Sequence, residues 1–226
     1  MKRFLSVVLG ITLSLCFVGT VTAETANTFA VGAIVTLGRY EQDNNLENGK
    51  EPVEWIVLDI KGNQALLISR LCLDARAYHT RFVPMTWSRC TLRAWLNDTF
   101  LTETFTQEEQ AKIPAVTLVN ADNPHYGTPG GADTTDRIFL LSETEAYQYF
   151  PDVAGRPGQP TEYAIAQGAY FNPSSGNTWW WLRSPGVRPI DASGVRSDGR
   201  ISGYGSRDVY RPSGALRPAL WYMFGE

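Results

Sequence analysis

Arginine and tyrosine side chains gather in the last third of this chain, where they offer hydrogen bonds and aromatic faces to a ligand. Seven arginines follow Trp181, against four acidic residues. A guanidinium group binds carboxylates and anionic sugars through a rigid, two-pronged donor, and loops with Tyr, Ser, Gly and Arg have the composition of adaptable recognition surfaces. We therefore expect the loops from Val187 to Gly214 to bind a ligand, the alternative being solvated loops without a function. The candidate ligand-binding residues are Trp180, Arg188, Arg196, Arg200, Tyr204, Arg207 and Tyr210.

Three consecutive tryptophans, Trp179 to Trp181, precede these loops. Successive side chains of a strand point to opposite faces, so Trp180 is expected to point away from its two neighbours. One face must belong to the core. The other face either packs in the core as well or stacks on a sugar ring or a peptide.

Arg183 and Arg217 differ from the other arginines of the tail because apolar residues flank them. A buried guanidinium group needs charged or hydrogen-bonding partners. We therefore expect internal acids, such as Asp136 or Glu145, to pair with these two arginines in a structural role.

Two cysteines, Cys72 and Cys90, remain once the first 23 residues are set aside. If the protein is exported, an oxidising compartment favours a disulfide between them. The alternative is a catalytic thiol activated by His79, which would need a third group to orient the histidine. The sequence supplies no clear candidate for that third group.

Other catalytic and cofactor motifs are absent from the sequence. His79 and His125 are the only histidines, so a histidine-rich zinc site is excluded. There is no Gly-x-Ser-x-Gly elbow, phosphate-binding loop or dinucleotide fingerprint. We predict no catalytic residue, no cofactor and no metal. Four oxygen-bearing side chains lack the spacing of an ordered calcium loop and are expected to serve turns and caps: Asp122, Asn123, Asp133 and Asp136.

The N-terminus is typical of an export signal. Lys2 and Arg3 precede an apolar stretch from Phe4 to Val18, and Val21-Thr22-Ala23 forms a small-residue cleavage site. We divide the chain into a signal peptide (1–23), a flexible lead-in (24–32) and a single globular domain (33–226). An uncleaved membrane anchor is the alternative for the first segment.

The mature protein is expected to be secreted, either extracellular or in the cell envelope. No later apolar stretch is long enough to cross a bilayer. The net charge of the whole chain is −3, and it becomes more negative when the two basic residues leave with the signal. An acidic chain gives no reason to expect nucleic acid as a partner.

Strands are predicted before residue 70 and helices after it. Residues 33–37 form a first strand, and residues 53–60 and 64–69 form a hairpin that turns at Gly62, where glycine accommodates a positive φ. Thr106 with Glu109, and Ser142 with Glu145, match the capping box at a helix start. A further helix is expected to begin at a cap on residue 88 and to bury one face. The residues of that face are Leu92, Trp95, Leu96 and Phe100.

Short strands return at the end of the chain. A polar loop over residues 120–136 leads into a strand over 137–141, and strands follow over 179–183, 194–197, 200–202 and 215–222. The pair around Asp198-Gly199 is expected to be a hairpin. Because strands and helices are segregated, we predict an α+β fold with antiparallel sheets rather than a parallel βαβ array.

Five motifs occur in order along most of the chain: Val53–Leu58, Thr91–Asn97, Thr135–Ser142, Trp180–Gly186 and Leu216–Trp221. With these motifs the chain resembles a bacterial family of domains of unknown function, number 6273, which implies no activity.

The tail is also similar to the end of C-type-lectin-like domains. That resemblance implies a C-type-lectin-like fold in which the first and last strands pair, and in which a long irregular loop region projects a binding face. Gln159-Pro160-Thr161 and Trp95-Leu96-Asn97-Asp98 depart from the motifs of calcium-dependent sugar-binding lectins, so that calcium chemistry is not implied.

These observations predict a secreted, non-enzymatic domain that binds an extracellular glycan or protein. An extracellular enzyme acting on cell-wall or glycan material is the alternative, and it would need a pocket in which an acid, a base or a nucleophile converges. A structural module of the cell envelope is a third interpretation.

Overall fold

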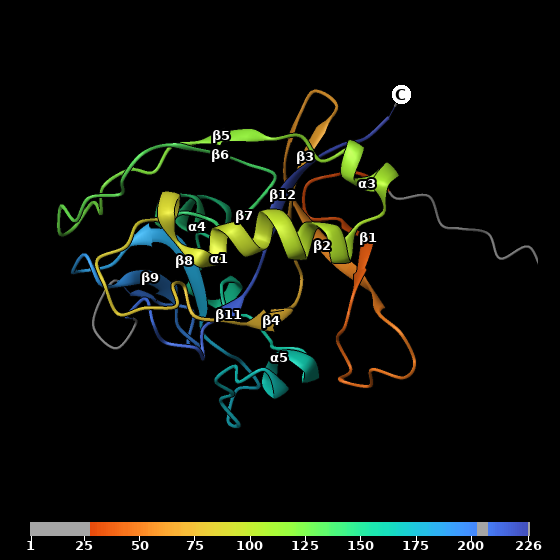
Figure 1. Cartoon of the computed structure of the whole chain (residues 1–226). Helices are drawn as coiled ribbons and strands as arrows, with labels where there is room; N and C mark the ends of the chain where they lie inside the picture. The colour runs from red at the N-terminus through yellow and green to blue at the C-terminus, as the bar shows by residue number, and fades with distance from the viewer. Residues whose placement is uncertain (1–27, 203–207, 226) are drawn as a thin grey trace, which may run out of the picture.

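The computed structural model describes residues 28–202 and 208–225 of the chain (Figure 1). They form two five-stranded sheets, a two-stranded ribbon and short helices. The predicted α+β class with antiparallel sheets is therefore confirmed. The segment predicted to be a signal peptide, and residues 24–27 of the predicted lead-in, lie outside the described residues. Within the described ranges no helix has both the length and the apolar character that a membrane span requires.

The first sheet is built on the hairpin predicted over residues 53–69. Its two strands pair antiparallel and turn at Gly62, which has a φ of 61°. The strand order is β1-β2-β3-β12-β7, with antiparallel pairing throughout. The bounds are β1 Ile34–Tyr40, β2 Glu51–Lys61, β3 Gln64–Ser69, β12 Ala219–Met223 and β7 Ile138–Phe139.

The first and last strands share this sheet but do not pair with each other. β12 lies between β3 and β7, and two strands separate it from β1. The direct pairing implied by the C-type-lectin-like resemblance is therefore wrong for this chain.

The second sheet has the order β10-β9-β8-β11-β4, in which only β11 and β8 run parallel. The hairpin predicted around Gly199 forms its edge. The single closing strand expected over residues 215–222 is wrong, because the chain leaves one sheet for the other at Arg217 and Pro218, and proline has no backbone N–H to donate. The bounds are β10 Ile201–Ser202, β9 Ala192–Val195, β8 Trp180–Pro185, β11 Ala215–Leu216 and β4 Asp74–Ala75.

A continuous helical segment crosses the middle of the domain (Figure 1). Its N-cap is Cys90 rather than the predicted Ser88, because the Cys90 sulfur accepts a hydrogen bond from the backbone N–H of Arg93 at 3.4 Å. The segment includes a π-helical turn. Its parts are α1 Thr91–Trp95, η2 Leu96–Phe100 and α2 Leu101–Thr104, and a separate 3₁₀ turn, η1 Trp87–Arg89, precedes Cys90.

The remaining helices are short and begin at capping side chains. Both predicted capping boxes are confirmed, at Thr106 before α3 (Gln107–Ala111) and at Ser142 before α4 (Glu143–Tyr149). The predicted polar loop 120–136 is shorter than expected, since β6 (Thr134–Asp136) pairs with β5 (Val116–Leu118). The last helical turns are η3 Val153–Gly155 and α5 Glu162–Ala166.

Replacing Thr106 with Ala is expected to lower the free energy of unfolding by about 1 kcal/mol. The Thr106 hydroxyl accepts the backbone N–H of Glu109 at 3.2 Å, and alanine leaves that donor without its partner. Chemical denaturation measures the change. Thr102→Ala is the matched control, because the Thr102 hydroxyl only donates to carbonyls of its own helix. Equal losses in the two variants would contradict the capping role.

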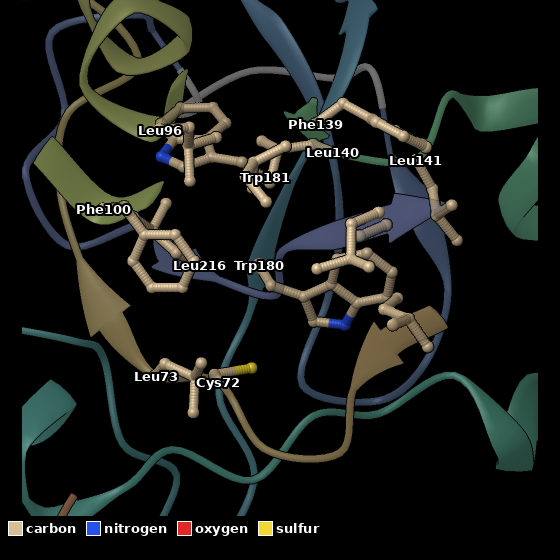
Figure 2. Packing of buried hydrophobic residues seen from close by; sticks show 14 of the residues in the cluster. Cys72, Leu73, Leu96, Phe100, Phe139, Leu140, Leu141, Trp180, Trp181 and Leu216 are labelled. Atoms are coloured by element: carbon tan, nitrogen blue, oxygen red, sulfur yellow. The ribbon is translucent and has the colours of Figure 1, made fainter. Parts of the chain in front are cut away.

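All three consecutive tryptophans belong to the core. Trp180 and Trp181 are fully buried and Trp179 is 8% exposed. The rings of Trp179 and Trp181 meet at a centroid distance of 4.7 Å, so they share a face of the strand, as the alternation predicted. Figure 2 shows Trp181 towards Leu96 of the helical segment and Trp180 on the other side, above Cys72.

Two glycines let the backbone approach these indoles closely. A Cβ atom on Gly214 would lie 1.9 Å from the indole nitrogen of Trp181. A Cβ atom on Gly158 would lie 2.5 Å from the Cys72 sulfur and 3.1 Å from Cδ1 of Trp180. Any larger residue would therefore displace the core at these two positions.

Residues 28–32, expected to belong to a flexible lead-in, contact the domain. The ring of Phe29 stacks on those of Phe224 and Tyr222, with centroid distances of 4.6 and 5.8 Å. The backbone N–H of Gly32 also donates to the carbonyl of Val57 at 2.8 Å. This part of the lead-in is packed on the first sheet.

Candidate functional site

The predicted ligand-binding loops hold some of their candidate side chains by internal ion pairs. Arg188 donates to both carboxylate oxygens of Asp191 at 2.8 and 2.9 Å. Arg196 lies 3.5 Å from a carboxylate oxygen of Asp198. Arg200 and Tyr210 are exposed, whereas two further candidates, Tyr204 and Arg207, lie outside the described residues.

Trp180 is not part of any surface, so its place among the ligand-binding candidates is corrected. Its side chain is fully buried, and its indole nitrogen donates to the carbonyl of Arg156 at 3.1 Å. The guanidinium carbon of Arg217 lies 5.4 Å from its ring centre. Trp180 therefore packs in the core instead of facing a ligand.

The two cysteines are free, buried thiols, so the expected disulfide is absent from the structure. Cys72 lies against Gly158, whereas Cys90 caps the helical segment, and each position has its own packing role. Burial raises the pKa of both thiols to about 12. A thiol held in its protonated form is a poor nucleophile, which also disfavours the catalytic alternative with His79.

A pocket of about 410 Å³ lies where α4, β5 and the end of β8 meet the first sheet. We call it the α4 pocket. Its volume lies in the range of small-ligand sites. Its polar and aromatic lining includes Lys61, Asn120, Glu145, Tyr149, Arg183 and Trp221.

An ion pair between Arg183 and Glu145 forms one wall of the α4 pocket. Arg183 donates to both carboxylate oxygens of Glu145, with 2.9 Å between Nη2 and Oε1. Glu145 also accepts the backbone N–H of Ser142 at 2.8 Å, so the same side chain caps α4. Burial alone would raise the pKa of Glu145, but the hydrogen bonds and charge of Arg183 outweigh it and hold that pKa below its usual value.

The expectation of an internal acid is thus confirmed for Arg183 and wrong for Arg217. Arg217 is buried between the rings of Phe150 and Trp180, and its Nε donates to the carbonyl of Ser69 at 2.9 Å. No acid pairs with it among the described residues. Burial lowers its pKa. Aromatic faces take the place of the predicted carboxylate.

Two buried polar atoms of the pocket lining have no hydrogen-bond partner in the described structure. They are Oδ1 of Asn120, an acceptor, and Nε of Arg183, a donor. Each belongs to a side chain that is at least nine-tenths buried. Buried polar groups are usually paired, but both atoms lie beneath the surface of the lining, so a ligand group reaches them only if the lining moves.

Aromatic side chains complete the α4 pocket. Trp221 is half-buried on β12, and the ammonium group of Lys61 lies 5.0 Å from its ring centre. The hydroxyl of Tyr149 donates to Asp59 at 3.3 Å. Burial and the negative charge of Asp59 raise the pKa of Tyr149 to about 12, which keeps its hydroxyl protonated.

The charges of the lining balance. Lys61 and Arg183 carry positive charge, and Asp122 and Glu145 carry negative charge. Both oxygens of Glu145 are engaged by Arg183, and one oxygen of Asp122 accepts the backbone N–H of Gly130 at 2.9 Å. The charges of the lining side chains therefore sum to zero.

Residues 62–222 match the model of a family described as a domain of unknown function, DUF6273. This chain is a member of the DUF6273 family. No curated protein and no solved structure matches it. The α4 pocket of the DUF6273 domain lies almost wholly within the matched residues, with Lys61 just outside them.

The sequence indicated this pocket only in part. Arg183 was expected to pair with an internal acid such as Asp136 or Glu145, and it pairs with Glu145, but nothing in the sequence showed that this pair would line a pocket. Asn120 lay in a segment interpreted as a polar loop, and Trp221 in a strand interpreted as closing the core. The periodicity of a strand alone does not show whether a tryptophan such as Trp221 lies in the core or at a pocket.

Proposed function

We propose that this protein is a secreted, non-enzymatic binding domain whose ligand is an uncharged carbohydrate held in the α4 pocket. The observation that carries the proposal is the lining of that pocket, which combines balanced charges, unpartnered polar atoms and the aromatic ring of Trp221. A sugar ring offers hydroxyl groups to the polar atoms and an apolar face to an indole. A C-type-lectin-like scaffold belongs to this proposal; β1 and β12 lie in one sheet, although they are not neighbours in it.

The α4 pocket supports this function better than the loops chosen from the sequence. The arginines there are partly neutralised by Asp191 and Asp198. A ligand at those loops would have to break charge-assisted hydrogen bonds before it could bind.

Replacing Trp221 with Ala is expected to weaken carbohydrate binding at least about tenfold, since an aromatic platform of the pocket is lost. A glycan array with the purified protein identifies the oligosaccharide that binds best, and calorimetric titration gives its affinity. Circular dichroism verifies that the variant is folded. Lys61→Ala, at a side chain that is 68% exposed, is a second pocket variant that leaves the core untouched.

Tyr210→Ala is the matched control, because Tyr210 is an exposed aromatic residue outside the α4 pocket. Its affinity for the same oligosaccharide is expected to stay within about twofold of the wild type. If Tyr210→Ala abolishes binding while the pocket variants do not, the ligand binds at the loops. An array without any bound glycan would remove the carbohydrate proposal.

A further inference from the structure

Three carboxylates meet at the loop between β1 and β2 and at the first residue of β2. Glu41, Asp43 and Glu51 each place a carboxylate oxygen so that the three oxygens lie within 4.8 Å of one another. Figure 1 shows the loop, residues 41–50, projecting from the end of the first sheet. Three like charges at such distances repel one another strongly unless a cation or a proton offsets them.

Backbone and side-chain donors fix two of the three carboxylates. Glu51 accepts the backbone N–H of Gln42 at 2.7 Å, through Oε2. Asp43 accepts the backbone N–H of Asn45 at 2.8 Å and the side-chain amide of Asn48 at 2.7 Å. These bonds hold the two carboxylates in place. Oε1 of Glu51 takes no part in them.

Glu41 supplies an independent sign of a missing partner. The residue is only 6% exposed, and its Oε1 is buried without a hydrogen-bond partner in the described structure. A buried, ionised carboxylate oxygen without a partner is strongly unfavourable.

None of the three carboxylates forms an ion pair with a basic side chain of residues 28–202 and 208–225. The nearest basic residues along the chain point elsewhere: Arg39 donates to the carbonyl of Lys50, and Lys50 donates to the carbonyl of Glu103. The negative charge of the cluster is therefore not compensated within the described chain.

We propose that Glu41, Asp43 and Glu51 bind a calcium ion. The donor set consists of carboxylate oxygens alone, without a histidine or cysteine, which is the set that hard cations prefer. Calcium accepts irregular arrangements of six to eight oxygens, including water, whereas magnesium requires near-octahedral geometry. An irregular group of three carboxylates, with water as a further source of oxygen ligands, fits calcium better than magnesium. The site lies outside the residues that match the family model.

Calorimetric titration of the EDTA-treated, purified protein with CaCl₂ tests the proposal. We expect one calcium ion to bind with a dissociation constant of about 10⁻⁴–10⁻³ M, the range of extracellular calcium modules. Magnesium is expected to bind at least about tenfold more weakly. Thermal unfolding provides a second readout, because calcium that binds only the folded state raises the melting temperature.

Glu41→Gln is expected to weaken calcium binding at least about tenfold while keeping the shape of the side chain. Glu47→Gln is the matched control, because it removes one negative charge from the same loop without touching the cluster. Its affinity should stay within about twofold of the wild type. Equal losses in the two variants would show a diffuse charge effect and overturn the site.

A proton shared between Glu41 and Asp43 is the competing explanation of the cluster. It predicts no heat of binding with calcium up to about 10 mM. That result overturns the calcium site. Because the α4 pocket is assayed separately with oligosaccharides, failure here leaves the carbohydrate proposal unaffected.

Discussion

Replacing Arg183 with Met is expected to lower the free energy of unfolding by about 3 kcal/mol. The change keeps the volume of the side chain but removes both hydrogen bonds to Glu145 and the donor to the carbonyl of Leu140. It leaves Glu145 with no counter-charge. We place the loss at the lower end of the values for buried pairs, because the Glu145 side chain is 27% exposed. Urea denaturation measures the change.

Arg70→Met is the matched control for this prediction. Arg70 pairs with Glu54 at 2.6 Å, but both side chains are about half exposed, so its loss is expected to stay below about 1 kcal/mol. If the Arg183 and Arg70 variants lose the same amount, the α4 pocket wall is not a buried ion pair in solution.

The Arg183 effect should depend on pH through Glu145. The pKa of this carboxyl is lower in the folded state than its ordinary value of 4.5. A lowered folded pKa gives stability that is complete above the unfolded pKa and disappears as the pH falls through the folded one. Without Arg183, burial raises the pKa of Glu145, so the difference between wild type and Arg183→Met is expected to be largest at about pH 7 and to shrink as the pH falls towards the lowered folded pKa of the wild type. A difference that grows towards acid would contradict the ion pair.

Features set by neighbouring residues were predictable from the sequence. The β2–β3 hairpin follows from alternation around one turn glycine, and the α3 and α4 starts follow from a hydroxyl and a carboxylate three residues apart. Each of these interactions lies within one turn of chain, so residue types and spacing are sufficient to specify it.

Features set by distant residues were not predictable in the same way. The sequence could not show that Cys90 caps a helix while Cys72 packs beside Gly158, because a disulfide depends on the distance between Cβ atoms. Arg217 was expected to meet an acid and meets aromatic rings instead. Both outcomes depend on how the two sheets pack together, which leaves no local signal.

The α4 pocket shows the same division. Its ion pair joins Arg183 and Glu145, which are 38 positions apart, and Trp221 of its lining comes from β12, near the end of the chain. The sequence identified the types of residue that recognise ligands. It indicated a site in the loops from Val187 to Gly214 because arginine is abundant there. The structure instead brings the unpartnered polar atoms of Asn120 and Arg183 together at the α4 pocket.

Replacing Trp180 with Ala is expected to lower the free energy of unfolding by about 3–5 kcal/mol. The indole is fully buried, and its removal leaves a cavity beside Arg217 and Gly158 as well as an unpaired carbonyl at Arg156. Urea denaturation measures the loss, and a variant too unstable to purify is tested as Trp180→Phe, with a smaller loss expected.

The comparison with Trp221→Ala decides which of the two tryptophans serves a ligand. Trp180 is enclosed, so its replacement acts on stability first and on binding only through the fold. Trp221 is half-buried at the α4 pocket, so its replacement is expected to cost less stability and more affinity. If Trp180→Ala stays within about 1 kcal/mol of the wild type and loses ligand binding, the tryptophan predicted from the sequence contacts the ligand and the α4 pocket does not.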